Sequence, residues 1–439
     1  MQNKEIIVIC TVILLSGCGN RLDLEGYAKD FYPVTEQMEQ MNWDSARVMH
    51  ICEFQDDLED SSRDDYLLAI LESATIDYMN KENDTALNKY KNADSLITYI
   101  RGREFSEEIS AFLTSDLALS YQGSDYEQVL VNYYMMKIYI EEGDIESALV
   151  ECRAVNEKLE LLNDNYAEDR RNRYSDDAFV QMITGLLYEA NADKNNALVS
   201  YRNALDIYAT QYADRYNLAP PSFLIRKVLE FTHDAGLYDL EDQYRHQWGD
   251  IVADYPQTES VLLVVETGFA PPRYELEVEI ADGIELRMPY IKEEHVLQES
   301  PTFLTIENVT TGEIYAASIA QDIGQIAMEN LEDFRTRYAL RCLGSEVLRG
   351  LARDAVKEVS QGFGLFGMIA GAVVNATVFN KEETDLRAWL SLPDEIYIAE
   401  IPVSSIESNL IVHMDTLAVS LNPEDIRGSS EMGLLFTRI

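Results

Sequence analysis

The sequence predicts an α+β protein of several domains, with an all-helical amino-terminal half and a carboxy-terminal half containing a mostly antiparallel sheet. Residues 26 to about 250 are rich in Ala, Leu, Tyr and Glu, nearly free of proline, and apolar at helical spacing. From Val261 onward, β-branched or alternating segments stand between glycine and proline turns. With 439 residues, of which 46% are hydrophobic, the chain can form two or three domains with real cores.

The chain begins with an apolar run, residues 6–15, followed by Ser16, Gly17 and Cys18. Roughly ten apolar residues are too few to span a ~30 Å hydrocarbon core as a helix. Small residues beside a cleavage point fit a secretory leader, and a thiol can accept a lipid. The stretch resembles a bacterial lipoprotein signal peptide, which implies cleavage between Gly17 and Cys18 and acylation of Cys18. An ordinary cleaved signal or a buried segment is the alternative.

This leader predicts where the protein resides. Residues 1–17 would be removed, and amino-terminal acyl chains would tie the mature chain to a membrane. Stable anchoring takes more than one acyl chain, and the resemblance implies three. Gly19, not an aspartate, follows the cysteine, which resembles the default signal for outer-membrane sorting. We therefore expect a cell-envelope protein anchored in the outer membrane and facing the periplasm.

The charge balance argues against nucleic acid as a partner. Lys and Arg total 35 against 78 Asp and Glu, a formal net charge of −43. Nucleic-acid affinity comes largely from neutralising phosphates, so this surface repels it. Solubility, or a salty medium that screens the charge, accounts for most of the excess. The acidic segment 53–65 lacks the glycine and alternating ligands of a calcium loop, so we expect a solvated face.

The cysteines do not form a recognisable framework. Beyond the leader and Cys18, the widely separated Cys52, Cys152 and Cys342 remain. Three such residues make neither a disulfide scaffold nor a CxxC metal pattern. We expect buried thiols, and one long-range bridge in an oxidising compartment stays open.

A recurring combination of residues marks the helical half. Tyr139 is followed nine residues later by Ala148 across a Gly-Asp turn, and Tyr188 is followed nine later by Ala197. Small residues let helices cross closely, and bulky neighbours fill the remaining space. The pattern resembles tetratricopeptide repeats, although its intervals exceed their unit of about 34 residues. Further members are Gly185, Tyr201 and Ala204, with weaker copies at Ala74, Asp77, Ala86, Tyr90 and Ala93 and at Ala46 and His50.

This resemblance implies a TPR-like array of helical hairpins over residues 18–255, which binds envelope proteins on one face. A generic helical bundle is the alternative. The carboxy-terminal domain is expected over 256–439, with a helical and glycine-rich insert at about 323–380. Its predicted strands are 261–265, 274–280, 284–289, 302–308, 313–318, 395–401, 409–414 and 434–438.

The insert contains two unusual segments. One is basic and carries Arg335, Arg337, Arg341, Arg349 and Arg353. It predicts either pairing with the acidic helical half or a site for an anionic ligand. The other, residues 361–375, repeats small residues every fourth position, a spacing that lets helices touch closely. A buried helix and a membrane-dipping or partner-docking hairpin are both open.

The chain then re-enters the domain through residues 385–393, Asp-Leu-Arg-Ala-Trp-Leu-Ser-Leu-Pro. We expect Trp389 and Leu392 to fix this segment on the sheet, while the spacing of Asp385 and Arg387 does not by itself imply an ion pair. The order of helical repeats, the segment 268–271, the basic helix, the glycine-rich segment and this run resembles a family of uncharacterised bacterial envelope lipoproteins with TPR-like repeats. That resemblance implies a location and an architecture, and no reaction.

Motifs for catalysis are missing. None of the five histidines forms HExxH or another metal spacing, and no GxSxG elbow, Walker loop or dinucleotide fingerprint occurs. We therefore expect no catalytic residue, metal or cofactor, and a lipid-anchored scaffold or adaptor for envelope assembly, with polysaccharide or peptidoglycan machinery as its setting. The alternative is an envelope hydrolase or carbohydrate-binding protein with its site in the carboxy-terminal domain. Candidate interaction residues are Arg335, Arg337, Arg341, Arg349, Arg353, Asp385, Arg387 and Trp389.

Overall fold

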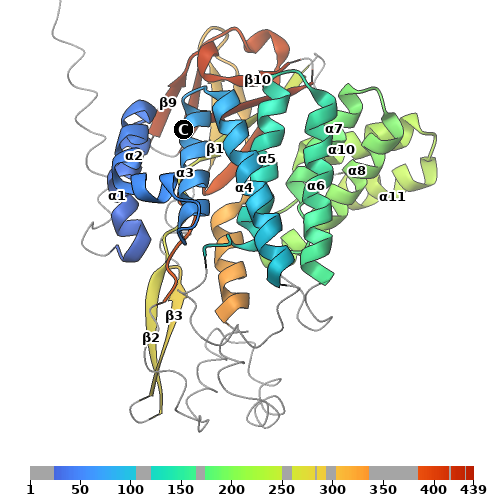
Figure 1. The fold of residues 1–439 in the computed structure, drawn as a ribbon. Helices are drawn as coiled ribbons and strands as arrows, with labels where there is room; N and C mark the ends of the chain where they lie inside the picture. Colours follow the sequence, from blue (N-terminus) through green and yellow to red (C-terminus); the bar gives the residue numbers. More distant parts are fainter. Residues whose placement is uncertain are drawn as a thin grey trace, which may run out of the picture.

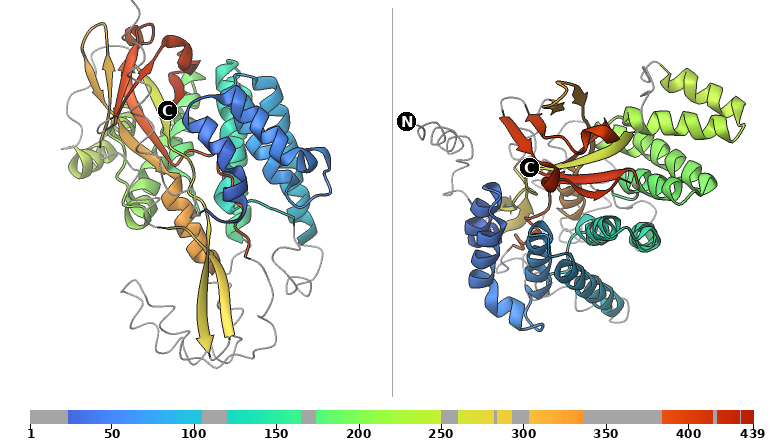
Figure 2. Two further views of the ribbon diagram at one scale, coloured as in Figure 1. Left: turned by 90° about the vertical axis from the view of Figure 1, so that its left-hand side faces the viewer. Right: turned by 90° about the horizontal axis from the view of Figure 1, so that it is seen from above.

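Paired helices stand side by side in a row that curves around the strands in the computed structural model (Figures 1 and 2). The side of this row that faces the strands is called the inner face below. The structure describes residues 24–104, 120–164, 174–249, 260–281, 284–292, 303–335, 384–414, 417–430 and 432–439. The leader with Gly17 and Cys18, the residues Arg337, Arg341, Arg349 and Arg353, and the segment 361–375 lie outside these ranges.

The helical half follows the sequence prediction. Its helices are α1 (Gly26–Glu39), α2 (Trp43–Glu59), α3 (Tyr66–Met79), α4 (Asn83–Glu104), α5 (Asp125–Glu141), α6 (Ile145–Asp164), α7 (Ala178–Ala190), α8 (Lys194–Ile207), α9 (Ala213–Arg215), α10 (Ser222–Asp234) and α11 (Tyr238–Trp248). A π-helical turn, Tyr208–Tyr212, joins α8 to α9. No described helix has both the length and the apolar content needed to cross a membrane.

Five helix pairs share one turn geometry. At the same place in each turn, one residue has a positive φ: Met41, Lys81, Gly143, Ala192 and Gly236. The next amide donates to a carbonyl five positions earlier, as Asp144 does to Tyr139 and Asp193 does to Tyr188, both within 2.9 Å. This is the Schellman hydrogen bond that ends a helix. The helical half is thus built of structurally equivalent hairpins.

The predicted small residues lie where these helices cross. Ala46, Ala86, Ala148 and Ala197 are fully buried, each at the same distance after its turn. At Gly185, an added Cβ would lie 2.4 Å from the ring of Tyr201. Because real Cβ atoms do not approach so closely, α7 and α8 pack as they do only with glycine there. The spacing read from the sequence therefore has a steric basis.

The carboxy-terminal half contains three sheets. Its strands are β1 (Ser260–Thr267), β2 (Tyr274–Ala281), β3 (Ile284–Tyr290), β4 (Leu304–Asn308), β5 (Ile314–Ala316), β6 (Ser318–Asp322), β7 (Glu395–Pro402), β8 (Leu410–Met414), β9 (Leu417–Leu421), β10 (Arg427–Ser429) and β11 (Leu434–Arg438). The orders are β10-β11-β1-β7-β6, β5-β4-β8-β9 and β2-β3. The β2–β3 hairpin projects from the body of the molecule (Figure 1).

Sheet pairing confirms a mixed but mostly antiparallel arrangement. Only β1 and β11 pair in parallel among the described strands. Strand β6 precedes the predicted insert and β7 follows it, and the two pair. A helix over 323–335 begins that insert. Strands β6, β9 and β10 were not predicted as separate strands, because they are short and lack a distinct alternating pattern.

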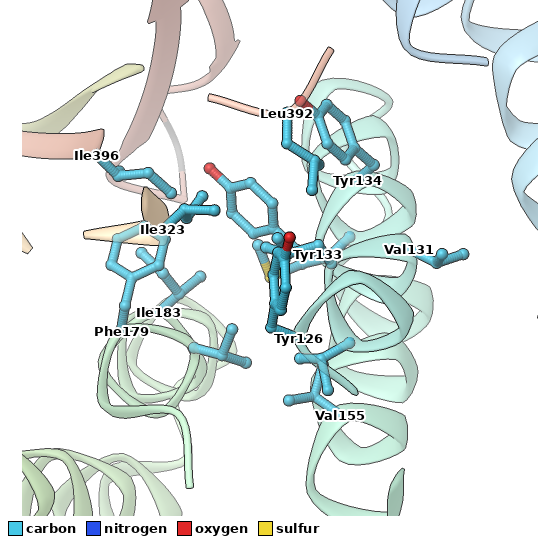
Figure 3. Packing of buried hydrophobic residues seen from close by; sticks show 14 of the residues in the cluster. Tyr126, Val131, Tyr133, Tyr134, Val155, Phe179, Ile183, Ile323, Leu392 and Ile396 are labelled. Atoms are coloured by element: carbon cyan, nitrogen blue, oxygen red, sulfur yellow. The ribbon is translucent and has the colours of Figure 1, made fainter. Parts of the chain in front are cut away.

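One large core joins the two halves. Tyr133 and Tyr134 of α5 lie near Leu392, Ile396 and Ile323 in Figure 3, and all five belong to the same buried cluster. Strand β1 contributes to this cluster from one face and to a second cluster, between the sheets, from the other. A strand buried on both faces reads as a continuous apolar run, which explains its sequence Val-Leu-Leu-Val-Val.

Candidate interaction site on the inner face of the helices

A segment of the chain itself, residues 384–394, lies against the inner face at α3 and α5 and turns at Leu390 and Ser391. The backbone amides of Leu390 and Ser391 donate to the carboxylate of Glu72 at 2.7 and 3.0 Å. The amide of Trp389 donates to Oε1 of Glu127 at 2.9 Å. Two side chains of the helices therefore hold three successive backbone N–H groups, which any amino-acid sequence except proline provides.

Glu127 is placed by the start of its own helix. It occupies the third position of α5, where it forms a capping box with Ser124. The hydroxyl of Tyr121 also donates to Oε2 of Glu127, at 2.7 Å. One oxygen thus completes the helix end, while the other reaches Trp389. The position of the Glu127 carboxylate is therefore set by hydrogen bonds at the start of its own helix.

Glu72 lies in a different electrostatic environment. It is fully buried in the middle of α3, directly after the apolar residues Leu68 to Leu71. Burial raises the pKa of Glu72 to about 8, and the charge of Glu127 adds to the shift, while the bonds from Ser391 and Leu390 oppose it. At neutral pH this carboxyl group is therefore mostly protonated.

Trp389 anchors the segment. Its side chain is fully buried, with ring centroids 6.1 Å from Tyr90 and 5.7 Å from Tyr134. The indole N–H donates to Thr75 Oγ1 at 3.1 Å and to Ser391 Oγ at 3.0 Å. We expected Trp389 to fix the chain on the sheet; it is bound instead by the helices. A buried indole needs a polar partner, and α3 supplies it.

Leu392 continues the segment toward the sheet. It is fully buried, and its carbonyl accepts a hydrogen bond from the amide of Ala270 at 2.8 Å. Two residues later, the amide of Asp394 donates to the carbonyl of Thr267, the last residue of β1, at 2.9 Å. The segment thus passes directly from the helices into the sheet.

The candidates Asp385 and Arg387 are brought together at the start of the segment. Arg387 pairs with Asp385 at 2.8 Å and with Asp65, just before α3, at 2.7 Å. These carboxylates raise the pKa of Arg387 further, against the effect of burial. Arg387 therefore ties the segment to the helices and is not an open interaction residue.

Arg335 is the one arginine of the basic segment within the described residues. It lies at the end of the helix over 323–335 and pairs with Glu332, one turn earlier, at 2.7 Å. This partner belongs to the same helix, so the pair does not test the expected pairing with the acidic helical half. The structure does not test the other four arginines.

The sequence reading missed Glu72 and Glu127. Glu72 follows Leu-Ala-Ile-Leu in an almost wholly apolar helix, and an acid in such a run is a signal of a buried polar role. Glu127 follows Ser124 at the spacing of a capping box. Across the described part of the chain, no three His, Cys, Asp or Glu side chains gather as a metal site would require.

The two remaining cysteines within the described ranges differ in environment. Cys52 is exposed and Cys152 is buried, and both are free. Burial raises the pKa of Cys152 to about 12. The expectation of a buried thiol is thus confirmed at Cys152 and wrong at Cys52, because α2 packs on one side only and turns Cys52 outward.

Comparison with known proteins adds no relative. No protein-family model matches the chain, and a search of curated proteins finds no match either.

Proposed function

We propose that this protein is a lipid-anchored scaffold or adaptor of the cell envelope, whose TPR-like helical array holds extended protein segments. Its setting is an envelope assembly such as polysaccharide or peptidoglycan machinery. The observation that supports an interaction role is the manner in which Glu72, Glu127 and the Trp389 slot hold residues 384–394. Backbone amides are bound by the carboxyl groups of Glu72 and Glu127, and one aromatic side chain is buried between the helices, which is how a groove recognises a peptide.

In this molecule the occupant of that groove belongs to the chain itself. Trp389 and Leu392 are fully buried, and the segment leads directly into β7. Residues 384–394 are therefore part of the permanent core, and the array uses its own recognition chemistry to fix the carboxy-terminal half. Envelope partners therefore bind to parts of the helical array that residues 384–394 do not cover.

The proposed anchor places the array close to the bilayer. If Cys18 is acylated, six peptide units separate it from Leu24, the first described residue. A fully extended chain of that length spans about 20 Å. The start of α1, Gly26, lies two residues further along, so it would lie within about 28 Å of the membrane surface, and the scaffold would present its partners at the membrane.

The test is crosslinking in cells, followed by purification through the carboxy terminus. The wild-type chain is compared with Cys18→Ala, and with Cys52→Ala as the matched control for loss of a thiol. We expect wild type and Cys52→Ala to recover the same envelope proteins, and Cys18→Ala to lose them. Mass spectrometry of the native protein would show an acylated Cys18 as the first residue. An intact leader, or unchanged partners in Cys18→Ala, would contradict the proposal.

A further inference from the structure

A cavity of about 240 Å³ lies between the helical row and the ends of β1 and β11. It is separate from the groove that holds Trp389. The charged residues that line it are Lys81, Lys137, Arg427, Arg438, Glu266 and Asp425. Four cations against two carboxylates is a positive balance, in a chain whose formal net charge is −43. Such a local excess of positive charge favours an anion.

Two of these cations are already neutralised by the protein. Lys137 is buried and donates to Oε1 of Glu266 at 2.6 Å. Arg427 pairs with Glu141 at 2.7 Å and also donates to Asn83 and to the carbonyl of Tyr78. Their charges are therefore largely balanced before any ligand enters.

Arg438 is different. It is only 6% exposed, and no described carboxylate lies within ion-pair distance of it. Its guanidinium donates to two backbone carbonyls, of Ser391 at 2.6 Å and Gly268 at 3.1 Å. These bonds use two of its five N–H groups, and its guanidinium carbon also lies 4.7 Å from the ring centroid of Phe269 and 5.9 Å from that of Trp43. A buried cation without a counter-charge is costly, and an anion bound in the cavity would remove that cost.

Glu266, on the neighbouring strand, has a buried carboxylate oxygen that lacks a hydrogen-bond donor. Its side chain is 1% exposed, and Oε1 accepts from both Lys137 and the hydroxyl of Tyr133. Oε2 is buried and has no hydrogen-bond partner. Glu266 and Arg438 are register partners on β1 and β11, and both line the cavity. The same wall thus offers one unsatisfied acceptor and one arginine that forms no ion pair with a described carboxylate.

The other residues that line the cavity restrict the kinds of ligand that it can bind. The rings of Trp43, Tyr78 and Phe436 also line the cavity, and cations of the protein lie over them: Arg427 and Lys137 over Tyr78, Lys137 over Phe436 and Arg438 over Trp43. A ligand ammonium at Glu266 would meet the Lys137 ammonium, so a hydroxyl is the better donor. The volume of about 240 Å³ suits one small molecule.

We infer that this cavity binds a small hydroxylated carboxylic acid of monosaccharide size, with its carboxylate toward Arg438 and a hydroxyl toward Oε2 of Glu266. A free sugar acid and the acidic end group of an envelope polysaccharide share this chemistry. The cavity size favours one sugar unit in either case.

Isothermal titration of the full chain tests this inference, with D-glucuronate and D-galacturonate as the probes. Glucose, which lacks the carboxylate, and acetate, which lacks the hydroxyls, are the controls. We expect at least one uronate to bind and both controls to fail. Absence of binding by both uronates, or equal binding by glucose, would overturn the inference.

Single substitutions then test whether the uronate binds in this cavity. Glu266→Gln should weaken uronate binding about tenfold or more, because the acceptor at Oε2 loses its charge. This substitution also alters the pair with Lys137, so two variants at the rim accompany it. Lys81→Met, at an exposed side chain, should weaken binding a few-fold, while Lys194→Met, an exposed lysine away from the cavity, should leave it unchanged.

Fluorescence gives an independent readout. Trp43 lines the cavity, whereas Trp389 is buried in the inner-face groove. A uronate should change the tryptophan emission of the wild-type chain, and Trp43→Phe should abolish that change. An undiminished change in Trp43→Phe would mean that the uronate binds elsewhere and would overturn the assignment of the site.

Discussion

The indole of Trp389 donates a hydrogen bond to Thr75 Oγ1 at 3.1 Å, although the two residues lie 314 positions apart in the chain. This contact joins the carboxy-terminal half to the third helix of the row. The first prediction concerns how much Trp389 contributes to the stability of the folded protein. Trp389→Ala leaves a large cavity between Tyr90 and Tyr134 and should lower the free energy of unfolding by about 3–5 kcal/mol.

Urea denaturation measures this loss, with Tyr99→Ala as the matched control. Tyr99 is an aromatic residue of α4 that is 61% exposed, so its removal should change stability by no more than about 0.5 kcal/mol. Equal effects of the two substitutions would show that the segment 384–394 does not stabilise the fold.

The second prediction concerns the crossing of α7 and α8. Gly185→Ala places a Cβ against the ring of Tyr201, and the resulting strain should cost about 1–3 kcal/mol of stability. A double-mutant cycle with Tyr201→Ala identifies the cause. Because the smaller side chain makes room, the double variant should be less destabilised than the two single changes together. Additive effects would exclude this contact as the reason for the glycine.

The third prediction concerns pH. The pKa of Glu72 is raised to about 8 in the folded protein, while an unfolded glutamate titrates near 4.3. Between these values the folded state binds the extra proton, so the stabilisation is fully present at acidic pH and is lost as pH rises to about 8. The slope should approach 1.4 kcal/mol per pH unit within that window.

Glu72→Gln removes this titration but keeps the side-chain shape. Its unfolding free energy should fall less steeply between pH 5 and pH 8 than that of the wild type. Asp322 has its pKa raised to about 7, chiefly by burial, so Asp322→Asn should remove a second, separate part of the slope. Identical pH profiles for the wild type and Glu72→Gln would contradict the assignment.

The fourth prediction distinguishes two thiols. Cys52 is exposed, whereas Cys152 is buried with its pKa raised to about 12. A thiol reagent reacts with the thiolate, so the native protein should be modified quickly at Cys52 and only after unfolding at Cys152. Peptide mapping follows each thiol separately: Cys52→Ser should remove the fast modification at position 52, and Cys152→Ser should leave it unchanged. A fast phase that survives Cys52→Ser and disappears with Cys152→Ser would show that α6 opens in the native state.

The sequence was most informative where the determining contacts are local. The nine-residue interval from Tyr139 to Ala148, and from Tyr188 to Ala197, spans one turn and two helix ends. The structure shows the same turn in each of the five described hairpins. The alternation in β2 and the apolar run of β1 likewise predict strands, since each pattern depends on neighbours within the same segment.

The candidate sites were harder to predict. Trp389 was singled out correctly as a fixed residue, but its neighbours were not foreseen, because Thr75, Tyr90 and Tyr134 come from distant helices. Arg438 and Glu266 carry ordinary charges in the sequence. The unsatisfied Oε2 of Glu266 and the absence of an ion pair at Arg438 among the described residues follow only from the pairing of β1 with β11 beside α5.

The sequence by itself determined the paired helices, the strands that follow them, and a leader expected to carry a lipid at Cys18. Only the tertiary structure decided that residues 384–394 fill the inner face, and that a cavity with an unsatisfied carboxylate oxygen lies beside it. The reason is physical: helical and strand periodicities are set by neighbours a few residues apart. Burial and the pairing of charges depend on segments that meet only when the chain has folded.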